Sequence, residues 1–110
     1  METEVSEMGN WVTVCRADEI APGQGKQVEV GGRAIAVFNA DGTYYAIGGE
    51  CTHQGGPLGE GELNGTTVTC PWHAAEFDVT TGKALALPAT EDVPVYRTAV
   101  EGGEVRVELP

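Results

Sequence analysis

The chain has 110 residues and a formal net charge of −11, with only six lysines and arginines. Such a charge is repelled by phosphate backbones and anionic membranes, which excludes nucleic acid and membrane surfaces as expected partners. The N-terminal METEVSEMGN is polar and acidic, unlike a signal peptide, and no apolar run is long enough to span a bilayer. The sequence therefore predicts a soluble, cytoplasmic protein with a single domain over residues 1–110, in which residues 1–10 form a flexible N-terminal segment.

Short runs of β-branched and aromatic residues recur along the chain between turn dipeptides such as Asp41-Gly42 and Asn64-Gly65. Runs of this length between turn residues are typical of antiparallel strands. The predicted strands, in chain order, are Trp11–Arg16, Lys26–Val30, Arg33–Asn39, Thr43–Ile47, Thr66–Cys70, Glu76–Val79, Val93–Glu101 and Glu104–Leu109. Only Ala17–Ala21 looks helical, and it is too short for more than one turn. The pattern predicts an all-β fold, a small sandwich or barrel of short antiparallel strands.

Two segments indicate how these strands are buried. Ala34–Phe38 reads AIAVF and is apolar on both faces, which suits a central strand. In the last segment Val105, Val107 and Leu109 alternate with polar residues, so that one face is expected to be buried and the other solvated. A Gly-Gly turn joins this segment to Tyr96–Glu101 and predicts a hairpin.

Residues 51–73 differ from the rest of the chain. Gln54–Gly61 contains four glycines and a proline, which is poor material for helix or strand and predicts a loop. The strand that ends at Cys70 leads into a second loop, beginning at Pro71. Each loop contains one cysteine and one histidine, spaced C-x-H at one end and C-x-x-H at the other, and 16 residues separate the two pairs. The four candidate ligands are Cys51, His53, Cys70 and His73.

Three chemistries fit these four residues. Zinc binds Cys and His, but its usual sequence signatures pair cysteine with cysteine or histidine with histidine. In this chain each pair contains one cysteine and one histidine. A thiol enzyme could use a Cys51–His73 or a Cys70–His53 pair. A Rieske centre needs two cysteines on one iron and two histidines on the other, which matches the set. The third cysteine, Cys15, lies in the apolar stretch WVTVCR and is expected to be a small buried hydrophobe.

At these residues the chain resembles the Rieske-type 2Fe-2S ferredoxins, in which C-x-H is followed, after a spacer of about this length, by C-x-x-H. The likeness continues through CPWHAAEFDVTTGKAL and covers nearly the whole chain from Trp11 onward. It implies a β scaffold with two cluster-binding loops at one tip and one 2Fe-2S cluster per chain. Cys51 and Cys70 would ligate the inner iron, and His53 and His73 the outer iron. A proline-bearing loop around Pro88 would cover them.

The resemblance also implies a function, that of a one-electron carrier and not an enzyme. Similar ferredoxins pass electrons from a flavin-containing reductase to a terminal oxygenase of the aromatic-ring-hydroxylating type. The acidic charge predicts transient electrostatic docking with such partners. A small carrier that docks transiently at two partners is expected to be a monomer. Two alternatives stay open at this point: a Rieske-like small subunit of an assimilatory nitrite reductase, and a zinc-stabilised interaction domain.

Departures from the high-potential branch of the family, which has CTHLGC and CPCHGSxY, predict a low reduction potential. Gly56 and Trp72 replace the two cysteines that form a disulfide between the loops in that branch, and Ala75 and Phe77 replace a serine and a tyrosine that donate hydrogen bonds to sulfur. Such bonds stabilise the reduced cluster, so their absence lowers the potential, to roughly −150 mV. Voltammetry checks this prediction, and a strongly positive value would refute it.

Overall fold

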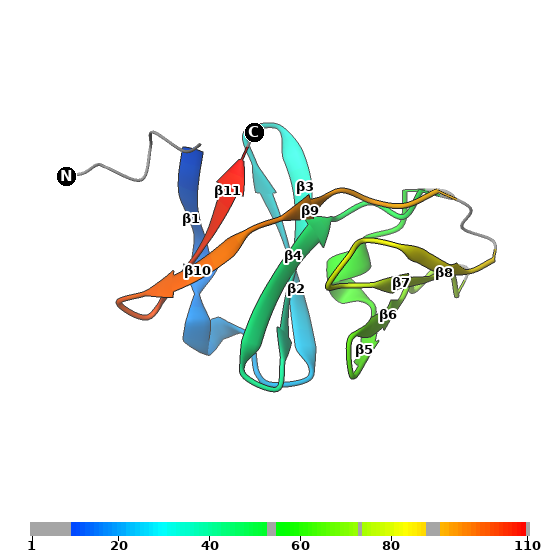
Figure 1. Ribbon diagram of the computed structural model, residues 1–110, viewed down its shortest axis with the longest axis horizontal. Coiled ribbons are helices and arrows are strands. Elements are labelled where there is room, and N and C mark those ends of the chain that lie inside the picture. Colours follow the sequence, from blue (N-terminus) through cyan, green and yellow to red (C-terminus); the bar gives the residue numbers. More distant parts are fainter. Residues whose placement is uncertain (1–9, 53–54, 73, 88–90, 110) are drawn as a thin grey trace.

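The computed structural model describes residues 10–52, 55–72, 74–87 and 91–109. In these residues eleven short strands form three antiparallel sheets, which confirms the predicted all-β fold. The sheets follow one another along the long direction of the molecule (Figure 1). The predicted flexible segment, residues 1–10, lies outside the described residues except for Asn10, with which the first strand begins. No helix within the described ranges is long and apolar enough to cross a membrane.

The central sheet has the order β2-β3-β4-β9. Its strands are β2 (Gln24–Val30), β3 (Arg33–Ala40), β4 (Thr43–Gly48) and β9 (Val95–Tyr96). Strand β3 sends Ala36 and Phe38 into one hydrophobic core and Ile35 and Val37 into the other, and all four are fully buried. The prediction that this apolar run forms a central strand is therefore confirmed, because a strand buried on both faces carries no polar alternation.

A second sheet lies at the end of the molecule where the chain begins, in the order β1-β11-β10. Its strands are β1 (Asn10–Arg16), β10 (Thr98–Glu101) and β11 (Glu104–Leu109). The hairpin across the Gly-Gly turn is confirmed, with Val105 and Val107 buried on one face of β11. The single strand predicted over Val93–Glu101 is wrong: β9 pairs with β4, and β10 pairs with β11. The chain changes sheets at Arg97, between them.

The third sheet lies at the opposite end of the molecule, in the order β5-β6-β7-β8 (Figure 1). Its strands are β5 (Glu62–Asn64), β6 (Thr67–Thr69), β7 (Glu76–Asp78) and β8 (Ala84–Ala86), and a 3-10 helix, η3 (Leu58–Glu60), precedes it. Strands β5 and β8 were not predicted. The helix η3 corrects the prediction of a loop throughout Gln54–Gly61, because fully buried Leu58 anchors a turn there.

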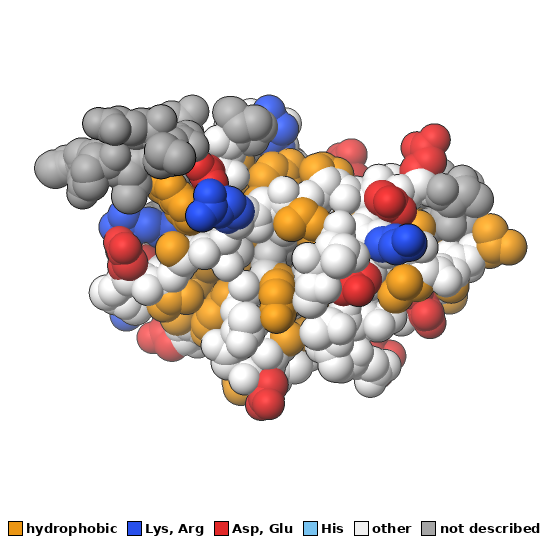
Figure 2. Space-filling view, viewed as in Figure 1, with side chains coloured by type: hydrophobic (Ala, Val, Ile, Leu, Met, Phe, Trp, Pro, Cys, Tyr) orange, Lys and Arg blue, Asp and Glu red, His pale blue; other side chains and the backbone are white. Residues whose placement is uncertain are grey.

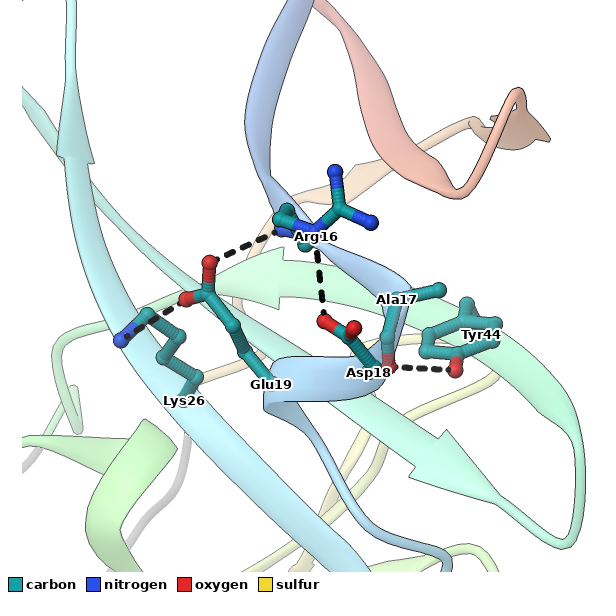
Figure 3. A network of polar contacts seen from close by, with 6 residues as sticks. All are labelled: Arg16, Ala17, Asp18, Glu19, Lys26 and Tyr44. Atoms are coloured by element: carbon teal, nitrogen blue, oxygen red, sulfur yellow. Dashed lines mark hydrogen bonds and ion pairs between the residues drawn. The ribbon is translucent and has the colours of Figure 1, made fainter.

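A polar network fixes the connection between β1 and β2 (Figure 3). The predicted single helical turn is a 3-10 helix, η2 (Ala17–Glu19). The Glu19 carboxylate accepts a hydrogen bond from the Arg16 backbone N–H and pairs with Lys26, while the Tyr44 hydroxyl donates to the Ala17 carbonyl at 3.0 Å. Exposed ion pairs contribute about 1 kcal/mol or less, so the Tyr44 bond is the more important link to the central sheet.

Candidate metal centre

The first cysteine-bearing loop follows β4 and closes on its own backbone. The Cys51 N–H donates to the Gly56 carbonyl at 2.8 Å, and the Gly55 N–H donates to the Cys51 carbonyl at 2.7 Å. Gly55 has a φ of +76°, a conformation that glycine adopts without strain. Cys51 itself is 3% exposed. These bonds bring Gly55 and Gly56 back to the backbone of the buried Cys51.

The second loop follows β6 and repeats this arrangement. The Cys70 N–H donates to the Ala75 carbonyl at 2.7 Å, and the Ala74 N–H donates to the Cys70 carbonyl at 3.2 Å. Ala74, like Gly55 the fourth residue after its cysteine, has a φ of +63°. Cys70 is 2% exposed. The two loops thus have the same pair of closing hydrogen bonds at the same spacing from their cysteines.

The loops meet at Gly56. A Cβ atom placed on Gly56 would lie 2.7 Å from the Cys70 Sγ and 3.1 Å from the Trp72 Cγ, too close for any side chain. Gly56 and Trp72 are the positions where the high-potential branch has its disulfide, and they lie side by side here as the resemblance implies. No disulfide joins the three cysteines, all of which are described.

The surroundings of both cysteines are apolar. Cys51 and Cys70 belong to one buried cluster that also contains Leu58, Ala75 and Phe77, each of the last three fully buried. Ala75 and Phe77 carry no hydroxyl, so neither can donate a hydrogen bond to sulfur. The low potential expected from these two residues stays a prediction.

Both candidate histidine ligands, His53 and His73, lie outside the described residues, as does Pro88 of the expected covering loop. In the chain each histidine falls inside one of the two closed loops, residues 51–56 and 70–75. Among the described residues, which lack both histidines, no group of three or more His, Cys, Asp or Glu is placed to hold a metal ion. The described half of the ligand set, two buried cysteines on loops that touch, fits the thiolate side of a Rieske cluster.

Residues 91–93 are held against the first loop and the β7–β8 hairpin. The Thr52 hydroxyl of the first loop donates to the Glu91 carbonyl at 2.7 Å. The Asp92 carboxylate accepts from the Ala84 N–H, and the Val93 N–H donates to the Gly82 carbonyl, both at 2.8 Å. Residues 91–93 therefore connect the first loop to the hairpin that follows the second. Sequence reasoning missed Thr52, because its partner is 39 residues away and no local pattern indicates the contact.

Cys15 lies away from this centre, as predicted. It is 8% exposed in β1 and belongs to the second core cluster. Burial raises the pKa of the Cys15 thiol, Glu19 raises that pKa further, and Lys26 lowers it. A thiol that stays protonated in an apolar core is a packing residue and a poor nucleophile.

Comparison with known proteins identifies the class. The model of the Rieske [2Fe-2S] domain matches residues 10–97. The chain is 39% identical over 102 residues to the 3-phenylpropionate/cinnamic acid dioxygenase ferredoxin subunit of Escherichia coli K12, covering 92% of this chain and 95% of that one. The chain belongs to the Rieske [2Fe-2S] domain family, and it carries one Rieske-type cluster.

Two solved structures place it more closely. The ferredoxin in a complex of reduced oxygenase and oxidized ferredoxin in carbazole 1,9a-dioxygenase matches with a TM-score of 0.82 and 36% identity, over 89% of this chain and 92% of that one. A putative NADH-dependent nitrite reductase small subunit from Mycobacterium tuberculosis has a TM-score of 0.82 with 27% identity, covering 93% and 96%. Within the family the protein is thus a ferredoxin, an electron carrier and not an enzyme.

Because Gly55 and Ala74 occupy equivalent positions in the two loops, reciprocal substitutions at these positions should have opposite effects on the stability of the protein. An alanine at positive φ costs about 1–2 kcal/mol relative to glycine. Ala74→Gly should therefore stabilise the protein by about 1 kcal/mol, and Gly55→Ala should destabilise it by about the same amount, because a Cβ on Gly55 meets nothing within 4 Å and adds backbone strain alone. Urea denaturation of the holoprotein measures both. Equal effects of the same sign would show that the two loops are not conformationally equivalent.

Proposed function

We propose that the cluster is held by the four side chains singled out in the sequence, Cys51, His53, Cys70 and His73, within a single domain over residues 1–110. The observation that carries this proposal is the pair of matched loops that touch at Gly56, each with one buried cysteine. Each loop also contains one of the two histidines of the chain. A site formed by both loops thus has two sulfur and two nitrogen donors, the set that a Rieske cluster requires.

The burial of the two cysteines supports the proposal that they ligate the inner iron. Cys51 and Cys70, at 3% and 2% exposure, lie in the apolar cluster, away from water. His53 and His73 are proposed to ligate the outer iron. When bound, the cluster supplies one-electron transfer. Cys51 and Cys70 would supply two thiolates, whose negative charge would offset the positive charge of the oxidised cluster.

We further propose that the electrons pass from a flavin-containing reductase to a terminal oxygenase in the cytoplasm, with this chain as a monomeric carrier. The support is the identity of 39% and 36% to two ferredoxins of dioxygenase systems, the second of them in complex with its oxygenase. The alternative, a nitrite reductase small subunit, has weaker support, because the identity to such a subunit is only 27%. The zinc-stabilised domain and the thiol enzyme have no support among these relatives.

The distribution of charge favours basic docking surfaces on the partners. Residues 50–92, which contain both loops and the third sheet, have seven acidic residues and one lysine, a net charge of −6 out of −11 for the chain. Four of the five other basic residues form ion pairs with carboxylates outside residues 50–92: Arg16, Lys26, Arg97 and Arg106. On the face shown in Figure 2, acidic side chains predominate over the third sheet, whereas most of the basic side chains lie towards the opposite end, among other acidic ones. A positive patch on a partner is therefore attracted to the cluster-bearing end.

Alanine substitution at each cysteine and histidine tests the ligand set, and Cys15 is the matched control. Cys51→Ala, Cys70→Ala, His53→Ala and His73→Ala should each lose the visible absorbance, the iron and the inorganic sulfide of the purified protein. Cys15→Ala should keep about one cluster per chain, because that thiol lies in the other core. Retention of an unchanged spectrum by any of the four ligand variants contradicts the set, as does zinc in place of iron in anaerobically purified protein.

Electron transfer to a candidate oxygenase should slow as salt is added, since the Debye length is about 8 Å at physiological ionic strength. At low salt, Glu91→Gln should slow the reaction about two- to fivefold, because one charge pair at 4 Å in water is worth about 1 kcal/mol. Glu101→Gln, which removes the same charge from the far hairpin, is the control and should leave the rate unchanged. Stopped-flow absorbance follows the reaction. Charge steering towards the cluster-bearing end is contradicted if the rate of electron transfer does not change with salt concentration, or if both variants slow the reaction equally.

A further inference from the structure

Gln27 connects β2 to both ends of the first cysteine-bearing loop. Its backbone pairs with Ala36 of β3, and its side-chain amide extends away from this ladder. The Nε2 group donates to the Gly49 carbonyl at 2.8 Å, and Oε1 accepts from the Gly59 N–H at 2.7 Å. Gly49 lies two residues before Cys51, and Gly59 lies three residues after Gly56. One amide therefore bridges the two stems of the loop.

The packing around this amide requires glycine at both stems. A Cβ on Gly49 would lie 2.6 Å from the Gln27 Nε2 and 2.9 Å from the carbonyl carbon of Ala34. A Cβ on Gly59 would lie 2.5 Å from the Gln27 backbone nitrogen and 2.7 Å from its Oε1. Both glycines are buried. The stems approach Gln27 as closely as a backbone can, so neither can shift toward β2.

Further backbone bonds join the stems to each other and to β3. The Leu58 N–H donates to the same Gly49 carbonyl at 2.9 Å, and the Gly49 N–H donates to the Ala34 carbonyl at 2.8 Å. Glu50 and Pro57, the next residues into the loop from Gly49 and Leu58, form an isolated antiparallel β-bridge. The Gln27 amide thus adds side-chain hydrogen bonds to the backbone hydrogen bonds that hold the two stems. Together these bonds determine the position of Cys51. A displacement of Gly49 moves Cys51, and with it the contact between Gly56 and Cys70.

We propose that Gln27 is a positioning residue for the cluster: its amide fixes the first loop so that the Cys51 sulfur keeps its place relative to the second loop. This inference rests on the proposed ligation by Cys51. A primary amide is needed because one stem presents an acceptor and the other a donor, and a carboxylate or a thioether satisfies at most one of them.

Two variants of Gln27 and two of Gln24 test this role. Gln27→Met keeps the length of the side chain and removes both hydrogen bonds, while Gln27→Glu keeps the acceptor for Gly59 and sets an anionic oxygen against the Gly49 carbonyl. Gln24, an exposed glutamine of the same strand, receives the same changes and controls for charge and strand propensity. The holoproteins are mixed with an iron chelator, and bleaching of the visible absorbance gives the rate of cluster loss.

Partners that orient metal ligands typically contribute about 10–100-fold in metal affinity, so both Gln27 variants should lose the cluster about tenfold faster than the wild type. The Gln24 variants should stay within about twofold of the wild type, as expected for surface substitutions away from the site. Both Gln27 variants should also shift the reduction potential and the g values of the reduced protein. Amide hydrogen exchange should increase in the peptide over residues 49–59 while β10 and β11 stay protected. These three readouts separate positioning from a general loss of stability.

The proposal is overturned if the Gln27 variants lose the cluster at the wild-type rate. It is equally overturned if they lose it only in proportion to a global fall in stability, with potential, g values and local exchange unchanged. The parallel Cys51→Ala variant separates this failure from failure of the ligand set. A colourless Cys51→Ala protein beside unaffected Gln27 variants rejects the positioning role alone, whereas a Cys51→Ala protein that keeps its cluster rejects the ligation on which the role rests.

Discussion

The close approach of the two loops at Gly56 is the constraint on which the site depends. A side chain at that position would occupy the space of the Cys70 sulfur, so the absence of a Cβ lets a turn after β4 touch a turn after β6. The two turns come from different sheets and reach the same depth of the same apolar cluster. Bringing two distant cysteines together in this way costs chain entropy, which the packing of Leu58, Ala75 and Phe77 around them offsets.

The shared closing pattern of the loops explains how an electron carrier keeps a fixed geometry. In both turns the backbone N–H and carbonyl of the cysteine are already bonded within the loop, so the sulfur is attached to a preformed frame. Around this frame, Thr52 connects the first loop to residues 91–93, and Gln27 connects its stems to β2. Because hydrogen bonds from several elements hold the first loop, we expect the geometry of the site to change little between oxidation states. A small change in geometry favours one-electron transfer.

Sequence patterns predicted the parts of the fold that depend on near neighbours. Turn dipeptides located the hairpins, and the doubly apolar run at Ala34–Phe38 located the central strand. The split of Val93–Glu101 at Arg97 was not predictable in this way, because it depends on which sheet offers a free edge. The three-residue strands β5 and β8 were missed for a related reason: so short a segment becomes a strand through its partner and not through its own composition.

The same division holds at the site. The spacing of Cys51, His53, Cys70 and His73 indicated a candidate ligand set, and the resemblance to the Rieske-type ferredoxins favoured a 2Fe-2S cluster among the chemistries that fit it. The contacts of Gln27 and Thr52 span 22 to 39 residues and leave no local signal. The positive φ of Ala74 also could not be predicted from the sequence, because alanine rarely adopts that conformation.

Pulsed EPR on reduced protein with ¹⁵N-labelled histidine tests the ligation most directly. Two sulfur and two nitrogen donors predict a signal of low average g value that carries coupling to two distinct histidine nitrogens. A reduced cluster whose signal shows no histidine coupling, or coupling to one histidine alone, contradicts the site assigned to the two loops.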